Sequence, residues 1–119
     1  MLDNVVVDKS KQFALDIIRL YRKLSDAKCP RELSSQILRS GTSIGANIRE
    51  GLVGQSTADF IARFNISLKE AKETEYWLDL LHEAGYIPNA HYEYIYPKNQ
   101  ELIKLLVSII KKANENKNN

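Results

Sequence analysis

The segment Leu38–Gly51 constrains the fold of this chain more than any other stretch. It holds three glycines and three hydroxyl residues in fourteen positions, a composition typical of a loop. The spacing around it indicates a helix instead, because apolar or small residues recur at steps of three and four. These positions are Leu33, Ile37, Gly41, Ile44, Ile48 and Leu52. We therefore predict a helix that gives up about 1 kcal/mol of propensity at each interior glycine, relative to alanine, so that a large group can pack against its backbone.

The same periodicity predicts three further helices. The four predicted helices span about residues 8–26, 30–53, 57–84 and 89–115. Residues 1–7 are predicted to be extended because they include three consecutive valines, and residues 116–119 are predicted to fray. Short connections force neighbouring helices to be antiparallel. The predicted fold class is therefore all-α, a single antiparallel up-down-up-down four-helix bundle.

Residues of known local preference support these boundaries. Asp8 or Ser10 is predicted to cap the first helix, and Ser56 followed three residues later by Asp59 resembles a capping box. Gly85 is the expected left-handed stop of the third helix. In the fourth helix, proline removes a backbone hydrogen bond, so we expect a kink or a short break near Pro97.

Antiparallel pairing of the second and third helices predicts which residues meet. Counting outward from their connection places Phe64 on Gly45 and Leu68 on Gly41. In this interpretation the phenylalanine ring fills the groove that the glycines leave. Leucine at either glycine is then expected to unfold the domain or disrupt its assembly through overpacking.

The same register brings Arg39 near Glu70, a candidate ion pair. Glu73, three residues further on, lies on the same helical face, where an arginine from another helix can also satisfy it. We prefer this structural interpretation of the glutamates to a catalytic one, because catalysis needs a pocket and convergent partners.

Other chemistry finds little support in the residues. Asp79 and His82 have acid-x-x-histidine spacing, but a di-iron bundle needs two such pairs, and the remaining histidine, His91, has no acid three residues before it. With two histidines and one cysteine, we find no credible nucleophilic triad. We expect no enzyme, no metal, no cofactor and no small-molecule substrate.

Composition limits the compartment and the partners. Cys29 is the one cysteine, so a reducing compartment is expected, with Cys29 as a small filler at a helix start. No apolar run is long enough for a membrane span or a signal peptide. We therefore expect a cytoplasmic protein that does not contact membranes.

Charge is distributed unevenly along the chain. The net formal charge is +2, but residues 1–49 have nine Lys/Arg and five Asp/Glu, whereas residues 50–101 have four and nine. A basic patch is predicted across the first helix and the following turn. Its residues are Arg19, Arg22, Lys23, Lys28 and Arg31. Such a patch can contact phosphates without reading sequence, although solvated faces of mixed charge are the alternative.

Three motifs give the chain a resemblance to a known family. They are Lys9-Ser10-x-x-Phe13-Ala14, the segment Ser35-x-x-Leu38 through Gly51, and Phe60-x-x-x-Phe64-x-Ile66-Ser67-Leu68-Lys69-Glu70-Ala71-x-Glu73-Thr74-x-Tyr76-Trp77-Leu78. With these motifs the chain resembles the bacterial four-helix bundle proteins called 23S rRNA-intervening-sequence proteins. Pro97 departs from the family pattern, because that helix is usually free of proline.

The resemblance implies a homopentamer of four-helix bundles. A related protein is the accessory variability determinant of diversity-generating retroelements, in which a basic pentamer binds a reverse transcriptase and nucleic acid. For this chain the resemblance implies a non-enzymatic homo-oligomer that binds RNA, or a nucleic-acid-processing protein, through its basic surface. The alternative is a protein-protein scaffold with no role in nucleic-acid binding.

Overall fold

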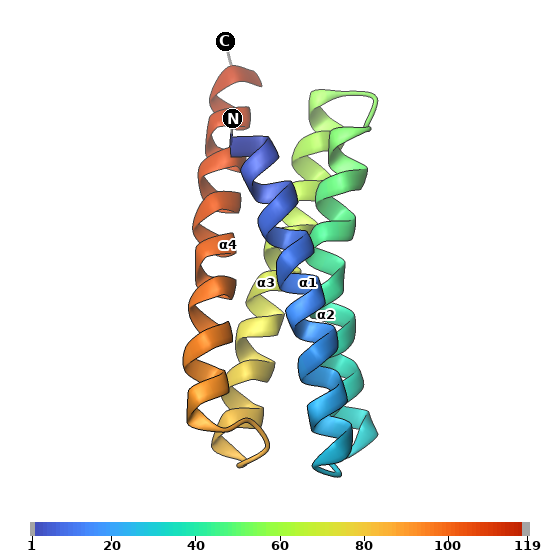
Figure 1. The fold of residues 1–119 in the computed structure, drawn as a ribbon. Coiled ribbons are helices and arrows are strands. Elements are labelled where there is room, and N and C mark those ends of the chain that lie inside the picture. Colours follow the sequence, from blue (N-terminus) through green and yellow to red (C-terminus); the bar gives the residue numbers. More distant parts are fainter. Residues whose placement is uncertain (1, 118–119) are drawn as a thin grey trace.

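Four helices account for most of the computed structural model, which describes residues 2–117. They are α1 (Leu2–Asp26), α2 (Arg31–Leu52), α3 (Thr57–Glu83) and α4 (Asn89–Lys117). Successive helices run in opposite directions, so the start of α1 and the end of α4 lie at the same end of an elongated bundle (Figure 1). Each helix packs on two others, in the cyclic order α1, α2, α3, α4. The predicted all-α four-helix bundle is confirmed.

The helix ends follow mostly local rules. The Ser56 side chain accepts a hydrogen bond from the backbone N–H of Asp59 at 3.1 Å, as the predicted cap requires. Gly85 has a φ of +89°, the left-handed conformation expected of it. The turn after α1 uses Lys28 in the same region, with a φ of +60°. Lys28 is a residue that the sequence pattern did not mark for this role.

The prediction for the N-terminal segment was wrong. Residues 2–7 belong to α1, and Asp8 and Ser10 lie inside the helix rather than at its cap. Val6 is fully buried in the core, and packing of this kind overrides the weak helix propensity of a β-branched residue. At the other end, residues 116 and 117 are still helical, so the predicted fraying is wrong for them, and residues 118–119 lie outside the described range.

Pro97 lies inside α4, which continues through it, so the short break was wrong, whereas the alternative of a kink stays a prediction. Proline deprives the carbonyl of Glu93, four residues earlier, of its helical partner. Both Pro97 and Glu93 are exposed, so water can hydrate that carbonyl and the helix continues. The neighbours Ile95 and Asn99 are buried and hold the helix against the core.

The predicted partners of the α2 glycines were wrong. A methyl group built on Gly41 would lie 2.7 Å from Ile17 Cγ1, and one on Gly45 would lie 3.2 Å from Ser10 Oγ, so both glycines face α1. Phe64 is fully buried but packs against Gly51, and Leu68 is half-buried.

The prediction failed because α2 packs on both α1 and α3, and its small residues face different helices. Gly41 and Gly45 face α1, whereas Gly51 faces α3. The contact of α2 with α3 includes Gly51 against Phe64 and two hydrogen bonds from hydroxyl groups. The Ser67 hydroxyl donates to the Ile44 carbonyl at 2.8 Å, and the Thr74 hydroxyl donates to Ser40 Oγ at 2.9 Å.

The predicted ion pair is present beside this contact. Arg39 Nη1 lies 3.2 Å from Glu70 Oε2, and the same guanidinium binds Glu73. Trp77 Nε1 donates to Glu73 at 3.1 Å. A single arginine from α2 thus satisfies both glutamates of α3, which accounts for these carboxylates without a catalytic role.

Candidate nucleic-acid interface

All five residues of the predicted basic patch lie at one end of the bundle. Arg19, Arg22 and Lys23 lie on the last two turns of α1, Lys28 is in the turn, and Arg31 begins α2. Each of them is exposed. This is the end opposite the two chain termini in Figure 1. The structure therefore places all five exposed cations at the same end of the bundle.

Most of these cations have no acidic partner. Arg19 Nη1 lies 3.2 Å from Asp16 Oδ1, but Arg22, Lys23, Lys28 and Arg31 form no ion pair within residues 2–117. Elsewhere, Lys9, Arg39 and Arg63 form ion pairs, for example Arg39 with its two glutamates and Arg63 with Glu50 at 3.0 Å. The other lysines and arginines of residues 2–117 form none. The patch is therefore distinguished by the number of cations that lie at one end of the bundle, not by their lack of acidic partners.

A groove of about 660 Å³ adjoins the patch between α1 and α4. Arg19 and Lys23 form its α1 side, and His91 and Tyr94 form its α4 side. Tyr86 and Pro88, from the connection between α3 and α4, close one end. Its volume is within the range of about 300–1,000 Å³ that is typical of ligand pockets.

Asp16 organises the wall of this groove. Its side chain is 11% exposed, and its Oδ1 accepts hydrogen bonds from Arg19 Nη1 and from the Tyr94 hydroxyl, both at 3.2 Å. Two donors from different helices therefore meet on one carboxylate. Asp16 fixes the positions of a cation and of an aromatic ring at the mouth of the groove.

The groove favours the neutral form of His91. Partial burial lowers its pKa below the ordinary value, and the nearby positive charge of Lys23 lowers the pKa further. The negative charge of Asp16 opposes these effects and is the smallest of the three. The positive charge of the groove therefore comes from Arg19 and Lys23, and the carboxylate of Asp16 offsets part of it.

The three alternating tyrosines of α4 have different roles. The hydroxyl groups of Tyr92 and Tyr96 donate to Asp79 and Glu75 of α3, and burial together with these bonds raises the pKa of both tyrosines. Tyr94 points to α1 instead and stays half-exposed. Lys98 Nζ lies 4.8 Å from the centre of the Tyr94 ring, a cation–π contact.

Sequence reasoning missed Asp16, His91, Tyr94 and Lys98 as parts of one site. The contact between Tyr94 and Asp16 joins residues 78 positions apart, so no local pattern reveals it. One indication was available. Tyr94 lies about half a turn away from Tyr92 and Tyr96, so it could not share their partner helix.

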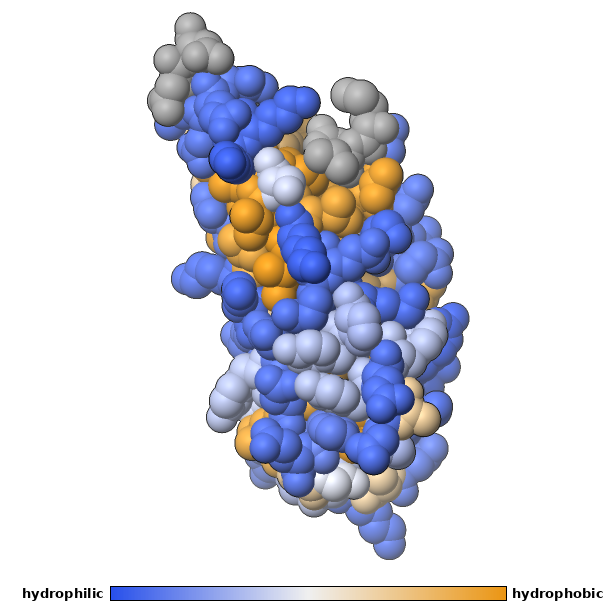
Figure 2. Space-filling view, turned by 90° about the vertical axis from the view of Figure 1, so that its left-hand side faces the viewer, coloured by the Kyte–Doolittle hydropathy of each residue, from blue (hydrophilic) through white to orange (hydrophobic). Residues whose placement is uncertain are grey.

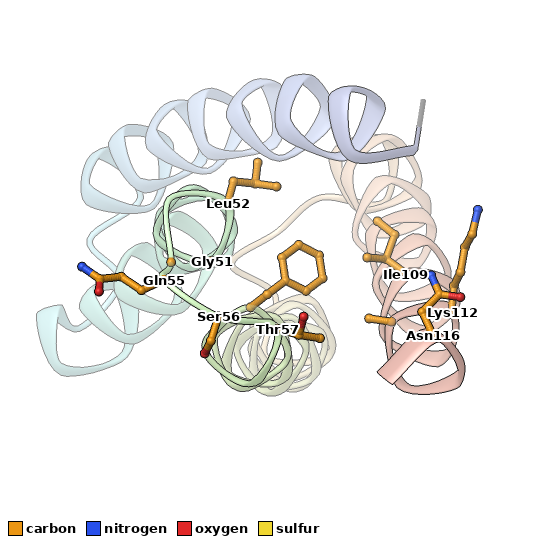
Figure 3. A pocket seen from close by; sticks show the side chains of 11 residues that line it. Gly51, Leu52, Gln55, Ser56, Thr57, Ile109, Lys112 and Asn116 are labelled. Carbon is orange, nitrogen blue, oxygen red and sulfur yellow. The ribbon is translucent and has the colours of Figure 1, made fainter. Parts of the chain in front are cut away.

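A second hollow, of about 570 Å³, lies near the chain termini. Figure 3 shows Leu52 of α2 and Ile109 of α4 on opposite sides of it, with Thr57 at the start of α3. Phe60 also lines it and stacks on Phe64 at 4.1 Å. Its lining combines apolar side chains with polar ones, among them Ser56, Asn116 and the positively charged Lys112.

Asp79 and His82, whose spacing resembles that of a metal-binding pair, contact other side chains instead. Asp79 accepts from Tyr92, while His82 stacks on the Tyr92 ring at 4.0 Å and lies 2.7 Å from Asn89 Oδ1. Residues 2–117 contain no group of three or more histidine, cysteine or carboxylate side chains placed to hold a metal ion.

Cys29 is buried, and burial raises the pKa of its thiol, as expected of a packing residue. None of the helices in the described range is long and apolar enough to span a bilayer.

Comparisons with known proteins agree with this architecture. Residues 2–108 match the family model described as 23S rRNA-intervening sequence protein. The chain is also similar to a crystal structure of a protein of unknown function from the S23 ribosomal protein family of Bacteroides thetaiotaomicron VPI-5482. The two share 57% sequence identity with a TM-score of 0.90, over 93% of this chain and 99% of that one. A search of curated proteins finds no match.

Proposed function

Because this chain belongs to the 23S rRNA-intervening sequence protein family, we propose that it is a non-enzymatic homo-oligomer that binds RNA through the basic surface of α1 and the following turn. The observation that carries this proposal is the group of four exposed cations, Arg22, Lys23, Lys28 and Arg31, without acidic partners in residues 2–117. Exposed arginine and lysine side chains bind phosphates and release counterions in doing so. In this proposal the protein acts in the cytoplasm, where Cys29 stays reduced.

Exposed apolar side chains support self-association. Val53 is 81% exposed and Val107 is 48% exposed, and both lie toward the end that holds the chain termini. Figure 2 shows apolar residues gathered in the upper part of the face that α4 presents, with polar residues over much of the lower part. Apolar patches rimmed by polar residues typically mark interaction sites. The resemblance described above makes a pentamer the expected assembly.

Electrophoretic mobility shifts with RNA test the basic surface. We expect the triple variant Arg19→Glu, Arg22→Glu and Lys23→Glu to lose RNA binding at low salt. The control is Lys69→Glu, Lys72→Glu and Lys111→Glu, three exposed lysines on α3 and the far end of α4 with the same change in net charge. Equal loss in both variants would show that net charge, not this surface, governs binding.

The competing function is a scaffold that binds proteins and not RNA. The uneven charge favours it, because the basic patch of α1 and the following turn can attract the acidic α3 of another subunit. Sedimentation of the α1 triple variant separates the two hypotheses. Loss of the oligomer in the variant, together with a wild-type protein that binds no RNA, would favour the scaffold. An intact oligomer that no longer binds RNA would favour the proposed function.

A further inference from the structure

We propose that the groove between α1 and α4 binds a single-stranded segment of RNA, with an unpaired base on the Tyr94 ring and flanking phosphates on Arg19, Lys23 and Lys98. This inference deepens the proposed function and rests on it. It specifies which form of RNA the basic surface selects and adds a residue, Tyr94, that touches the base.

The first argument is that Tyr94 is exposed and that its hydroxyl is held in place. Tyr94 is 52% exposed as a residue, whereas Tyr92 and Tyr96 are largely covered. Its hydroxyl is held by Asp16, at 3.2 Å from Oδ1 and 3.4 Å from Oδ2. The ring is therefore positioned before any ligand arrives, which reduces the entropy lost on binding.

The surroundings of the ring are the second argument. Lys98 lies 4.8 Å from the ring centre, and Arg19, whose side chain is 61% exposed, shares the Asp16 carboxylate with the Tyr94 hydroxyl. Lys23 lines the same groove. Aromatic rings set among cations are the arrangement by which proteins bind single strands, because bases stack on the rings while phosphates meet the cations.

The third argument concerns the class of nucleic acid. In a duplex the base faces are stacked on one another, so an aromatic side chain beside the backbone gains nothing from them. Cations alone bind both forms through phosphates. The exposed ring thus adds affinity only for an unpaired base, and the groove, at about 660 Å³, has the room to admit one.

Fluorescence anisotropy with two probes tests this inference. The probes are a labelled RNA of mixed sequence without self-complementarity, and the same strand annealed to its complement. We expect Tyr94→Ala to weaken binding of the single strand about tenfold and to change duplex binding by less than about twofold. Tyr76→Ala is the matched control, because Tyr76 is 57% exposed on α3, away from the groove.

Tyr94→Leu repeats the test with a variant that keeps the apolar bulk and removes the aromatic ring. Circular dichroism establishes that each variant is folded. Loss of single-strand affinity in both Tyr94 variants supports the inference. If wild-type protein binds both probes in a salt-dependent way and neither Tyr94 variant changes this, the inference fails while the proposed function stands. If wild-type protein binds neither probe at low salt, the proposed function fails.

Discussion

Gly41 and Gly45 lie four residues apart on the face of α2 that packs against α1, yet their surroundings differ. A methyl group at Gly41 would meet three atoms of Ile17 at 2.7–3.0 Å. Ile17 is fully buried and β-branched, so it cannot rotate away. At Gly45 the nearest atom is the Ser10 hydroxyl at 3.2 Å, which needs to move only a few tenths of an ångström.

We therefore expect Gly41→Ala to lower the free energy of unfolding by about 1–2 kcal/mol, because overpacking outweighs the gain in helix propensity. Gly45→Ala should stay within about 0.5 kcal/mol of wild type, since the two effects nearly cancel. Urea denaturation at fixed protein concentration measures both. A smaller penalty for Gly41→Ala than for Gly45→Ala would contradict the observed packing of α1 on α2.

His91 gives a prediction about pH. Its pKa in the folded protein is below the ordinary value of 6.5, so the unfolded chain binds a proton more readily. Stability should therefore fall as the pH drops through 6.5, and His91 should contribute no pH dependence well above that value. His91→Gln should show a smaller loss of stability between about pH 7.5 and 5.5 in urea denaturation. An identical loss in variant and wild type would rule out this assignment.

At the scale of single elements, α4 shows how much a helix tolerates when one of its faces is well packed. Leu102, Leu106 and Ile109 are buried, as their spacing predicts. The same spacing carried no information about Pro97, because continuation through a proline depends on whether water can reach the carbonyl four residues earlier. Residues 2–7 posed the same problem, since local propensity alone disfavours a helix there and burial of Val6 reverses it.

Pro97→Ala should stabilise the protein. The substitution restores a backbone donor for the Glu93 carbonyl at an exposed position, so we expect the free energy of unfolding to rise by about 1–3 kcal/mol. Thermal denaturation followed by circular dichroism measures it. Pro97→Gly is a useful comparison, because it restores the donor but has about 1 kcal/mol lower helix propensity than alanine. A drop in melting temperature for Pro97→Ala would show that the proline is required by its local geometry.

At the scale of the whole molecule, the sequence predicted the fold better than the site. Helical periodicity and short connections were enough for the bundle and for the Arg39–Glu70 pair, because both depend on neighbouring helices. The partners of Gly41 and Gly45 were misassigned because periodicity identifies a face but not the helix that covers it. The five cations lie close together in the sequence, so the sequence predicted them as a group. The sequence did not predict the groove, because α1 and α4 come together only when the whole chain has folded.

The central claim is that the cations of α1 and its turn bind RNA through phosphates. The most direct test is the dependence of the dissociation constant on salt for a single-stranded RNA. Each phosphate contact contributes about −0.7 to the slope of log affinity against log salt concentration, so the four cations without acidic partners in residues 2–117, Arg22, Lys23, Lys28 and Arg31, predict a slope of about 3 in magnitude. Lys23→Gln should reduce that slope by about 0.7. An affinity that is independent of salt, or no binding at the lowest salt concentration, would contradict the claim.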